Sequence, residues 1–205
     1  MSQLIIEPHY LGSLEYFCLF PHHQIIVLEV HDKFQKQTFR NRCYLLSSNK
    51  VLPLIVPVSY SSKSLVKEVV IDNSQRWKKD HWGAVYSSYG KAPYFEFFAD
   101  MINDVWRKNH KFLVDLNIEF LSLLVKILQL DVKLTLSEQQ EKKTELDLRN
   151  FITPKRSFVD RKIYQPIPYS QLFGDKFSPN LSIIDLIMCE GPNASSVLSA
   201  SFLKR

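Results

Sequence analysis

The chain has 205 residues, of which 45% are hydrophobic and 23% are charged, and these fractions exclude a disordered, collagen-like or disulfide-stapled class. Lysine and arginine number 26 against 21 acidic residues, so the net charge is +5, which favours anionic partners such as phosphates, nucleotide-sugars, nucleic acid or acidic lipid. The basic and acidic residues are interleaved, which disfavours a dedicated nucleic-acid binder. A chain of this length usually forms one domain, and we expect a single domain over residues 1–205.

The first thirty residues predict a β-α-β unit. Residues 4–6 predict a short strand, apolar residues recur at helical spacing between positions 11 and 20, and residues 24–30 form a continuous aliphatic run. A run of this kind is typical of a strand that is buried on both faces. Strand, helix and strand in this order indicate the α/β class.

Shorter strands and a group of helices follow. Residues 38–46 and 51–58 predict a pair of strands, and residues 66–71 predict another short strand. Apolar positions at helical spacing then predict three consecutive helices. They run from Trp77 to before Ala92-Pro93, from Phe95 to Trp106, and from Leu113 to Ile127.

The last third of the chain predicts a strand, a long loop and two short helices. Residues 130–136 alternate between apolar and polar, as in a half-buried strand. Residues 137–178 predict a helical turn around 144–150 and then a long loop, which is typical of a functional lid. Ser178-Pro179 is a plausible beginning for the first short helix and Gly191-Pro192 its end, and residues 194–203 predict the second.

These elements together predict an α/β fold, with α+β as the alternative. We expect a mixed β-sheet opened by the β-α-β unit, with the three consecutive helices and the two short C-terminal helices packed on it. Cys18, Cys43 and Cys189 lie far apart in apolar runs, so we expect free thiols in a reducing compartment. The N-terminus has no signal-peptide pattern and no stretch is apolar enough to span a bilayer, so we expect a cytoplasmic protein.

Several enzyme classes are disfavoured by missing motifs. The five glycines form no phosphate-binding loop, and the chain has no HExxH, no paired cysteine or histidine spacing for zinc and no GxSxG. This disfavours dehydrogenases, P-loop kinases, zinc proteases and α/β-hydrolases. The sequence predicts no metal site, but it leaves open whether Glu29, His31 and Asp32 recruit a metal, and it leaves the cofactor unknown.

The candidate catalytic residues are Glu29 and His31. Both point to the same side where a predicted strand ends, and ligands of open α/β sheets bind at the carboxyl ends of the strands. A carboxylate beside an imidazole can orient it as a general base. A strand-end pair in solvent explains the same pattern, so both interpretations stand.

The candidate binding residues begin directly after this pair. Lys36, Arg40 and Arg42 share one predicted strand face and suit a phosphate or carboxylate, although a charged edge strand has the same pattern. Asn41 lies on the opposite, apolar face, where its side-chain amide needs hydrogen-bond partners. The amide either bonds within the fold and has a structural role, or it contacts a ligand. Asn180 is a further candidate for positioning a ligand.

His81 lies in a segment that mixes basic and indole side chains, as single-strand nucleic-acid binders do. Helical spacing puts Trp77 and His81 on the core face and Lys78 and Lys79 on the other, which favours a core role for the tryptophan. We keep His81 as a candidate substrate contact and disfavour nucleic acid as the partner.

Sequence blocks along most of the chain carry a family resemblance. They are His9-Tyr10-Leu11, Glu15-Tyr16-Phe17, Glu29-Val30-His31-Asp32, residues 36–43, residues 77–82, Ala92-Pro93-Tyr94-Phe95, Asp147-Leu148-Arg149, Pro154-Lys155, residues 179–186 and Gly191-Pro192. In this order they resemble the WbqC-like protein family. The resemblance implies an association with bacterial surface-polysaccharide gene clusters, such as those for O-antigen, and a cytoplasmic protein that modifies an activated sugar.

Two main hypotheses follow, and the sequence leaves open whether the chain is an enzyme and what its oligomeric state is. The first is a transferase-type enzyme for a small anionic or sugar-containing substrate, with Glu29 and His31 as acid and base and residues 137–178 folding over the ligand. The second is a non-catalytic binding or assembly protein. A polar-lined pocket beside residues 29–42 would favour the first.

Overall fold

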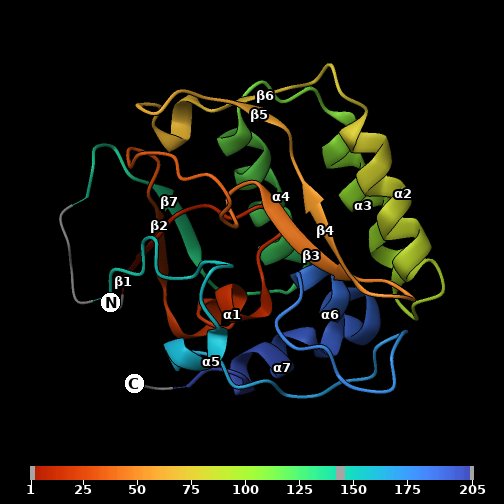
Figure 1. Ribbon diagram of the computed structural model, residues 1–205. Helices are drawn as coiled ribbons and strands as arrows, with labels where there is room; N and C mark the ends of the chain where they lie inside the picture. Colours follow the sequence, from red (N-terminus) through yellow and green to blue (C-terminus); the bar gives the residue numbers. More distant parts are fainter. Residues whose placement is uncertain (1–2, 142–145, 204–205) are drawn as a thin grey trace.

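The computed structural model describes residues 3–141 and 146–203 and confirms the α/β class (Figure 1). The strands are β1 (Gln3–Ile6), β2 (Ile25–Leu28), β3 (Arg42–Leu46), β4 (Val51–Ile55), β5 (Val58–Ser59), β6 (Val70–Ile71) and β7 (Lys133–Leu136). The α-helices are α1 (Leu14–Phe17), α2 (Trp77–Tyr89), α3 (Phe95–Arg107), α4 (Leu113–Ile127), α5 (Phe158–Arg161), α6 (Ile183–Glu190) and α7 (Ala194–Ala200). Single turns of 3₁₀ helix lie at Phe20–His22, Val66–Glu68 and Gly191–Asn193.

A parallel sheet in the order β1-β2-β7 places the polar residues of the candidate site at the ends of its strands. Ile6 pairs with Leu28 and Leu28 pairs with Leu136, so the strands end at the same level. Asp147 extends the sheet by a parallel bridge to Ile5 on the other side of β1. We call the end of the sheet formed by residues 7–9, 29–31, 137 and 148–150 the carboxyl edge. As expected, the middle strand β2 is buried almost throughout.

The remaining strands form two separate antiparallel pairs, β3 with β4 and β5 with β6. Figure 1 shows the β3–β4 pair between the parallel sheet and α2. The strand expected over 38–46 begins only at Arg42, because residues 38–41 form bends and a turn after Gln37, whose φ is 60°, and the Arg40 side chain enters the core. The strand expected over 66–71 is a 3₁₀ turn followed by the two-residue β6.

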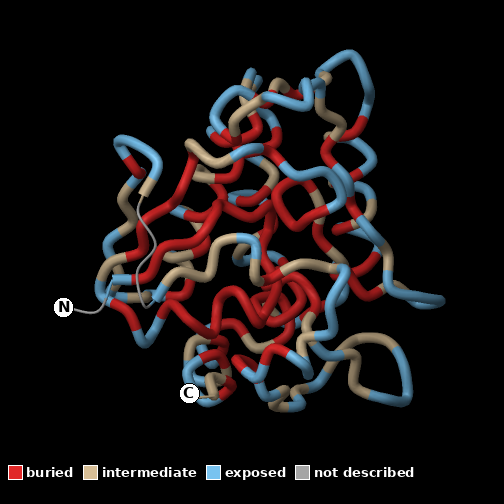
Figure 2. The backbone as a smooth tube through the Cα atoms, turned by 60° about the vertical axis from the view of Figure 1, so that its left-hand side comes forward, coloured by how far each residue is buried: buried red, intermediate tan, exposed pale blue. Residues whose placement is uncertain are grey.

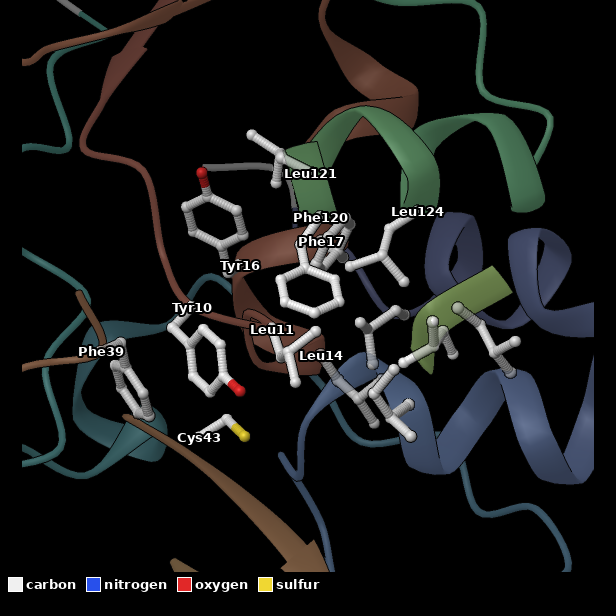
Figure 3. Packing of buried hydrophobic residues seen from close by; sticks show 14 of the residues in the cluster. Tyr10, Leu11, Leu14, Tyr16, Phe17, Phe39, Cys43, Phe120, Leu121 and Leu124 are labelled. Atoms are coloured by element: carbon white, nitrogen blue, oxygen red, sulfur yellow. The ribbon is translucent and has the colours of Figure 1, made fainter. Parts of the chain in front are cut away.

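The core joins the N-terminal segment to α4 and α6. Figure 3 shows the aromatic and leucine side chains around α1 packed together with those of α4. The rings of Tyr10 and Phe120, for example, lie 5.8 Å apart, nearly perpendicular to each other. Figure 2 shows buried backbone through the middle of the molecule and exposed loops at its periphery. The predicted helices that begin at Trp77, Phe95 and Leu113 are all present as α2, α3 and α4.

Local backbone geometry changes several predicted boundaries. The first helix is limited to α1 and a 3₁₀ turn, because buried Leu11 has φ of 45° and cannot continue a helix. The helix expected to begin at Ser178-Pro179 begins instead at Ile183, where the Ser182 hydroxyl accepts a hydrogen bond from the Ile184 N–H. Of the helical turn expected at 144–150, residues 144–145 lie outside the described residues, and residues 146–150 are non-helical.

The cysteines and the helices also bear on two expectations. Cys18, Cys43 and Cys189 are free and buried, as expected. Among residues 3–141 and 146–203, no helix has the length and apolar character that crossing a bilayer requires.

Candidate functional site

The strands β1 and β2 end in the same Glu-x-His pattern. Glu7-Pro8-His9 follows β1 and Glu29-Val30-His31 follows β2, and the parallel register places the two glutamates side by side. Both carboxylates are buried, with exposed fractions of 1% and 0%. The sequence analysis identified only the second pattern. The repetition of Glu-x-His after an aliphatic run is the signal that points to the first.

The Glu29 carboxylate is saturated with hydrogen bonds. Its Oε1 accepts from the backbone N–H of His31 at 2.7 Å and from the hydroxyl of Ser137 at 3.0 Å. Its Oε2 accepts from the N–H of Glu141 at 2.8 Å and from Nη1 of Arg149 at 3.3 Å. A buried carboxylate with this many donors holds its neighbours in place, which favours a positioning role for Glu29 over direct proton transfer.

His31 is oriented by this network and stays partly open to solvent. Its Nδ1 lies 3.1 Å from the Ser137 hydroxyl oxygen, and 18% of its side chain is exposed. When the hydroxyl of Ser137 donates its proton to Glu29, its oxygen can accept the proton of Nδ1. In this tautomer the neutral imidazole keeps its lone pair on Nε2, the form that a general base needs.

Arg149 is the cation of the carboxyl edge. Its Nε and Nη2 donate to the two oxygens of Asp147 at 2.9 and 2.6 Å, and its Nη1 lies 3.5 Å from Asp32. The hydrogen bond to Asp147 and the surrounding carboxylates raise the pKa of Arg149 above its ordinary value. With Glu29, three carboxylates surround one guanidinium, so this part of the edge is negative and disfavours a phosphate.

A second buried network surrounds Glu7. Arg40 Nη1 lies 3.4 Å and His9 Nε2 3.4 Å from its Oε1, and the Asn150 N–H donates to its Oε2 at 2.9 Å. Arg40 Nη2 also donates to the side-chain oxygen of Asn150 at 2.7 Å. Burial raises the pKa of Glu7, but the Arg40 charge and the hydrogen bonds from His9 and Asn150 outweigh it and bring the pKa to about 2. Burial lowers the pKa of His9.

The lowered pKa of Glu7 predicts that the free energy of unfolding of the protein depends on pH. The folded-state pKa of about 2 lies below the ordinary value of 4.5, so the carboxylate stabilises the fold above pH 4.5 and this contribution is lost as the pH falls towards 2. We expect Glu7→Gln to be less stable than wild type at pH 7 and the difference to shrink by pH 3, as measured by urea denaturation. Glu96 is exposed, so Glu96→Gln should leave the pH dependence of the free energy of unfolding as in the wild type. If the difference in free energy of unfolding between Glu7→Gln and wild type did not change with pH, this would contradict a lowered pKa of Glu7 in the folded state.

A polar pocket of about 220 Å³ lies beside these networks. It is lined by Phe39, Tyr44, Thr153, Pro154, Arg156, Ser157, Phe158, Arg161, Pro179 and Asn180. The ring centroids of Phe39 and His9 lie 5.5 Å apart, so the side of the pocket formed by Phe39 is adjacent to the Glu7 network. The exposed guanidinium of Arg156 forms no ion pair with any residue that the structure describes.

A buried ion pair forms another wall of this pocket. Arg161 donates from Nε and Nη2 to the two carboxylate oxygens of Glu15 at 2.6 and 2.5 Å, and from Nη1 to two backbone carbonyls. The side-chain oxygen of Asn180 accepts from the Glu15 N–H at 2.9 Å. The sequence analysis identified Asn180 but neither Glu15 nor Arg161, whose pairing spans 146 positions.

The predicted cationic strand face does not form. Lys36 is exposed, Arg40 is fully buried against Glu7, and Arg42 is partly buried in β3. The side-chain amide of Asn41 donates to the carbonyl of Val56 at 3.0 Å, which supports the structural interpretation of this residue. Arg40 therefore forms an ion pair with Glu7 in the core and does not contribute to a cationic surface.

His81 is buried, belongs to none of the segments that form the carboxyl edge, and lines a pocket of about 400 Å³ together with residues of β4 and α2. Its Nδ1 is 2.7 Å from the hydroxyl of Tyr10, which also accepts from the indole N–H of Trp106 at 2.9 Å. Burial lowers the pKa of His81 to about 4. A neutral histidine with this partner stabilises the packing of α2 on the N-terminal segment.

Comparisons with known proteins give one result. A family model described as the WbqC-like protein family matches residues 7–157 and 148–197. No curated protein and no solved structure matches the chain. Among the residues that the structure describes, no cluster of three or more histidine, cysteine or acidic side chains is suited to a metal ion.

Proposed function

The chain belongs to the WbqC-like protein family, and on this basis we propose that it is a transferase-type enzyme that modifies an activated sugar in bacterial surface-polysaccharide biosynthesis, such as that of O-antigen. The observation that carries the proposal is His31, a partly exposed imidazole at the carboxyl edge of a parallel sheet whose Nδ1 is engaged by Ser137 and Glu29. In open α/β sheets this edge is where ligands bind.

The negative charge around Arg149 indicates which reactant lies near His31. Glu29, Asp32 and Asp147 would repel a phosphate. A hydroxyl or amine nucleophile carries no negative charge before it reacts. In the proposed step, Nε2 of His31 takes the proton of this nucleophile as its bond to the transferred group forms, and the protonated imidazole then gives the proton to the leaving group.

The pocket beside Phe39 is the proposed site for an anionic part of the donor. Arg156 supplies the cation and Asn180 a polar contact, while Tyr44 and Phe158 offer aromatic walls for a ring. Its volume of about 220 Å³ is below the ~300–1,000 Å³ of pockets that enclose a drug-sized ligand. It therefore suits a phosphate or one sugar ring, with the rest of the donor outside.

One short segment connects the two parts of the proposed site. Arg149 contacts Glu29, and Thr153, four positions later, lines the pocket. Four residues span at most ~14 Å, so the backbone at the edge and at the pocket lies within reach of a single extended ligand. This segment belongs to the region 137–178 that the sequence predicts to fold over the substrate.

A thermal-shift screen tests the proposed function. Purified protein is screened against nucleotide-sugars, acyl thioesters and aminoacyl donors, and a ligand at one hundred times its Kd stabilises the fold by ~2.7 kcal/mol. For a domain of this size we expect Tm to rise by about 5–10 °C with a nucleotide-sugar. Arg156→Ala should remove most of this shift, whereas the adjacent exposed Lys155→Ala should retain it.

Two results would contradict the proposal. One is the absence of any shift with all three donor classes, which would favour the binding or assembly protein. The other is a shift that Arg156→Ala and Lys155→Ala reduce equally, since this would indicate binding through overall positive charge alone.

A further inference from the structure

Another pocket, larger than the pocket around Arg156, lies at the C-terminal end of α2. It has a volume of about 630 Å³ and is lined by Ser48, Tyr86, Ser87, Ser88, Gly90, Lys91, Leu172 and Phe173. This volume lies within the range of ~300–1,000 Å³ that is typical of small-molecule sites. The pocket shares no lining residue with the pocket around Arg156 and includes no residue of the carboxyl edge.

A buried carboxylate in α6 holds the two walls of this pocket together. Asp185 accepts hydrogen bonds from the hydroxyl of Tyr89 at 2.9 Å and from the amide of Gln171 at 2.8 Å. Tyr89 lies between the lining residues Ser88 and Gly90, and Gln171 directly precedes Leu172 and Phe173. The hydroxyl of Tyr169 donates to the same carboxylate. The separation of the walls is therefore set by hydrogen bonds to one side chain.

The lining residues combine hydroxyl groups, aromatic rings and one cation. Ser88 is 2% exposed, and its hydroxyl has no hydrogen-bond partner within residues 3–141 and 146–203. A buried hydroxyl without a partner is unfavourable, and a ligand that offers a hydroxyl would satisfy it after rotation of the serine side chain. Lys91 is exposed at this pocket, and no described lining residue is acidic.

We propose that this pocket binds a sugar ring that carries one anionic substituent. Serine hydroxyls both donate and accept hydrogen bonds, as sugar hydroxyls require. The rings of Tyr86 and Phe173 offer apolar surface to the C–H face of a pyranose. The ammonium group of Lys91 pairs with a phosphate or carboxylate on that sugar. The assignment does not depend on the proposed function, because it uses different residues.

Titration of the full chain with four probes tests the assignment by NMR. The probes are glucose 1-phosphate, glucuronic acid, glucose and inorganic phosphate. We expect one of the two anionic sugars to bind more tightly than glucose and phosphate, with the largest amide shifts at residues 86–91 and 172–173. Glucose 1-phosphate as the tighter ligand identifies a phosphate as the substituent, and glucuronic acid identifies a carboxylate.

Matched variants locate the binding. Lys91→Ala should weaken the anionic sugar about tenfold or more and leave glucose unchanged, and Phe173→Ala should weaken both. Lys79→Ala, which removes an exposed cation of α2 outside the pocket, should change neither. The proposal is overturned if no probe binds, or if Arg156→Ala removes the binding while Lys91→Ala and Phe173→Ala leave it intact.

Discussion

Replacing Arg40 with methionine should lower the free energy of unfolding by about 3–5 kcal/mol, because it leaves the buried Glu7 carboxylate without its cation. Arg40 and Glu7 are 0% and 1% exposed, so water cannot take the place of the guanidinium. For a domain of this length the loss corresponds to a decrease of about 6–20 °C in Tm. Urea denaturation at pH 7 measures the free energy directly.

Two comparisons separate the loss of the ion pair from the loss of packing. In the double variant Glu7→Gln/Arg40→Met the uncompensated charge is gone, and we expect part of the stability to return. Arg76→Met removes a guanidinium from an exposed pair with Asp80 and should cost no more than ~1 kcal/mol. Equal losses for Arg40→Met and Arg76→Met would show that Glu7 does not depend on Arg40.

His31→Gln should lower kcat by about 10²–10⁴-fold on the substrate that the thermal-shift screen identifies, the range typical for loss of a general base. The proposed anion contact is made by Arg156, so the thermal shift with the same ligand should persist. Ser137→Ala removes the group that engages Nδ1 and should reduce kcat less than His31→Gln does. His22→Gln provides a matched control, because His22 precedes β2 and lies at the opposite end of the sheet.

The tautomer of His31 can be measured without a substrate. Nitrogen-15 NMR of the neutral imidazole should show the proton on Nδ1, and Ser137→Ala should shift the population towards the Nε2–H form. A proton on Nε2 in the wild-type protein would contradict the proposed base. So would a His31→Gln variant that retains wild-type kcat.

Features that depend only on neighbouring residues in the sequence could be predicted well. The position of Glu29 and His31 after an aliphatic run places them at the end of a buried strand, and the structure has them there. The three central helices follow from apolar spacing alone. Arg40 shows the limit of this reasoning, because alternation predicts a shared face with Lys36 and Arg42, whereas the backbone turns at Gln37 and the guanidinium pairs with Glu7.

Residue order and periodicity were enough to predict the α/β class, with α+β as the alternative, the main buried segments and the polar residues at the end of β2. The three-dimensional arrangement was needed to show which groups become partners: Glu7 with Arg40, Glu29 with Ser137 and Arg149, and Glu15 with Arg161. Periodicity reports which side of a segment is buried, a property of neighbouring residues. Pairing between residues that lie 33 to 146 positions apart depends on which segments pack together, and many side chains of the same chemical type would satisfy a buried carboxylate equally well.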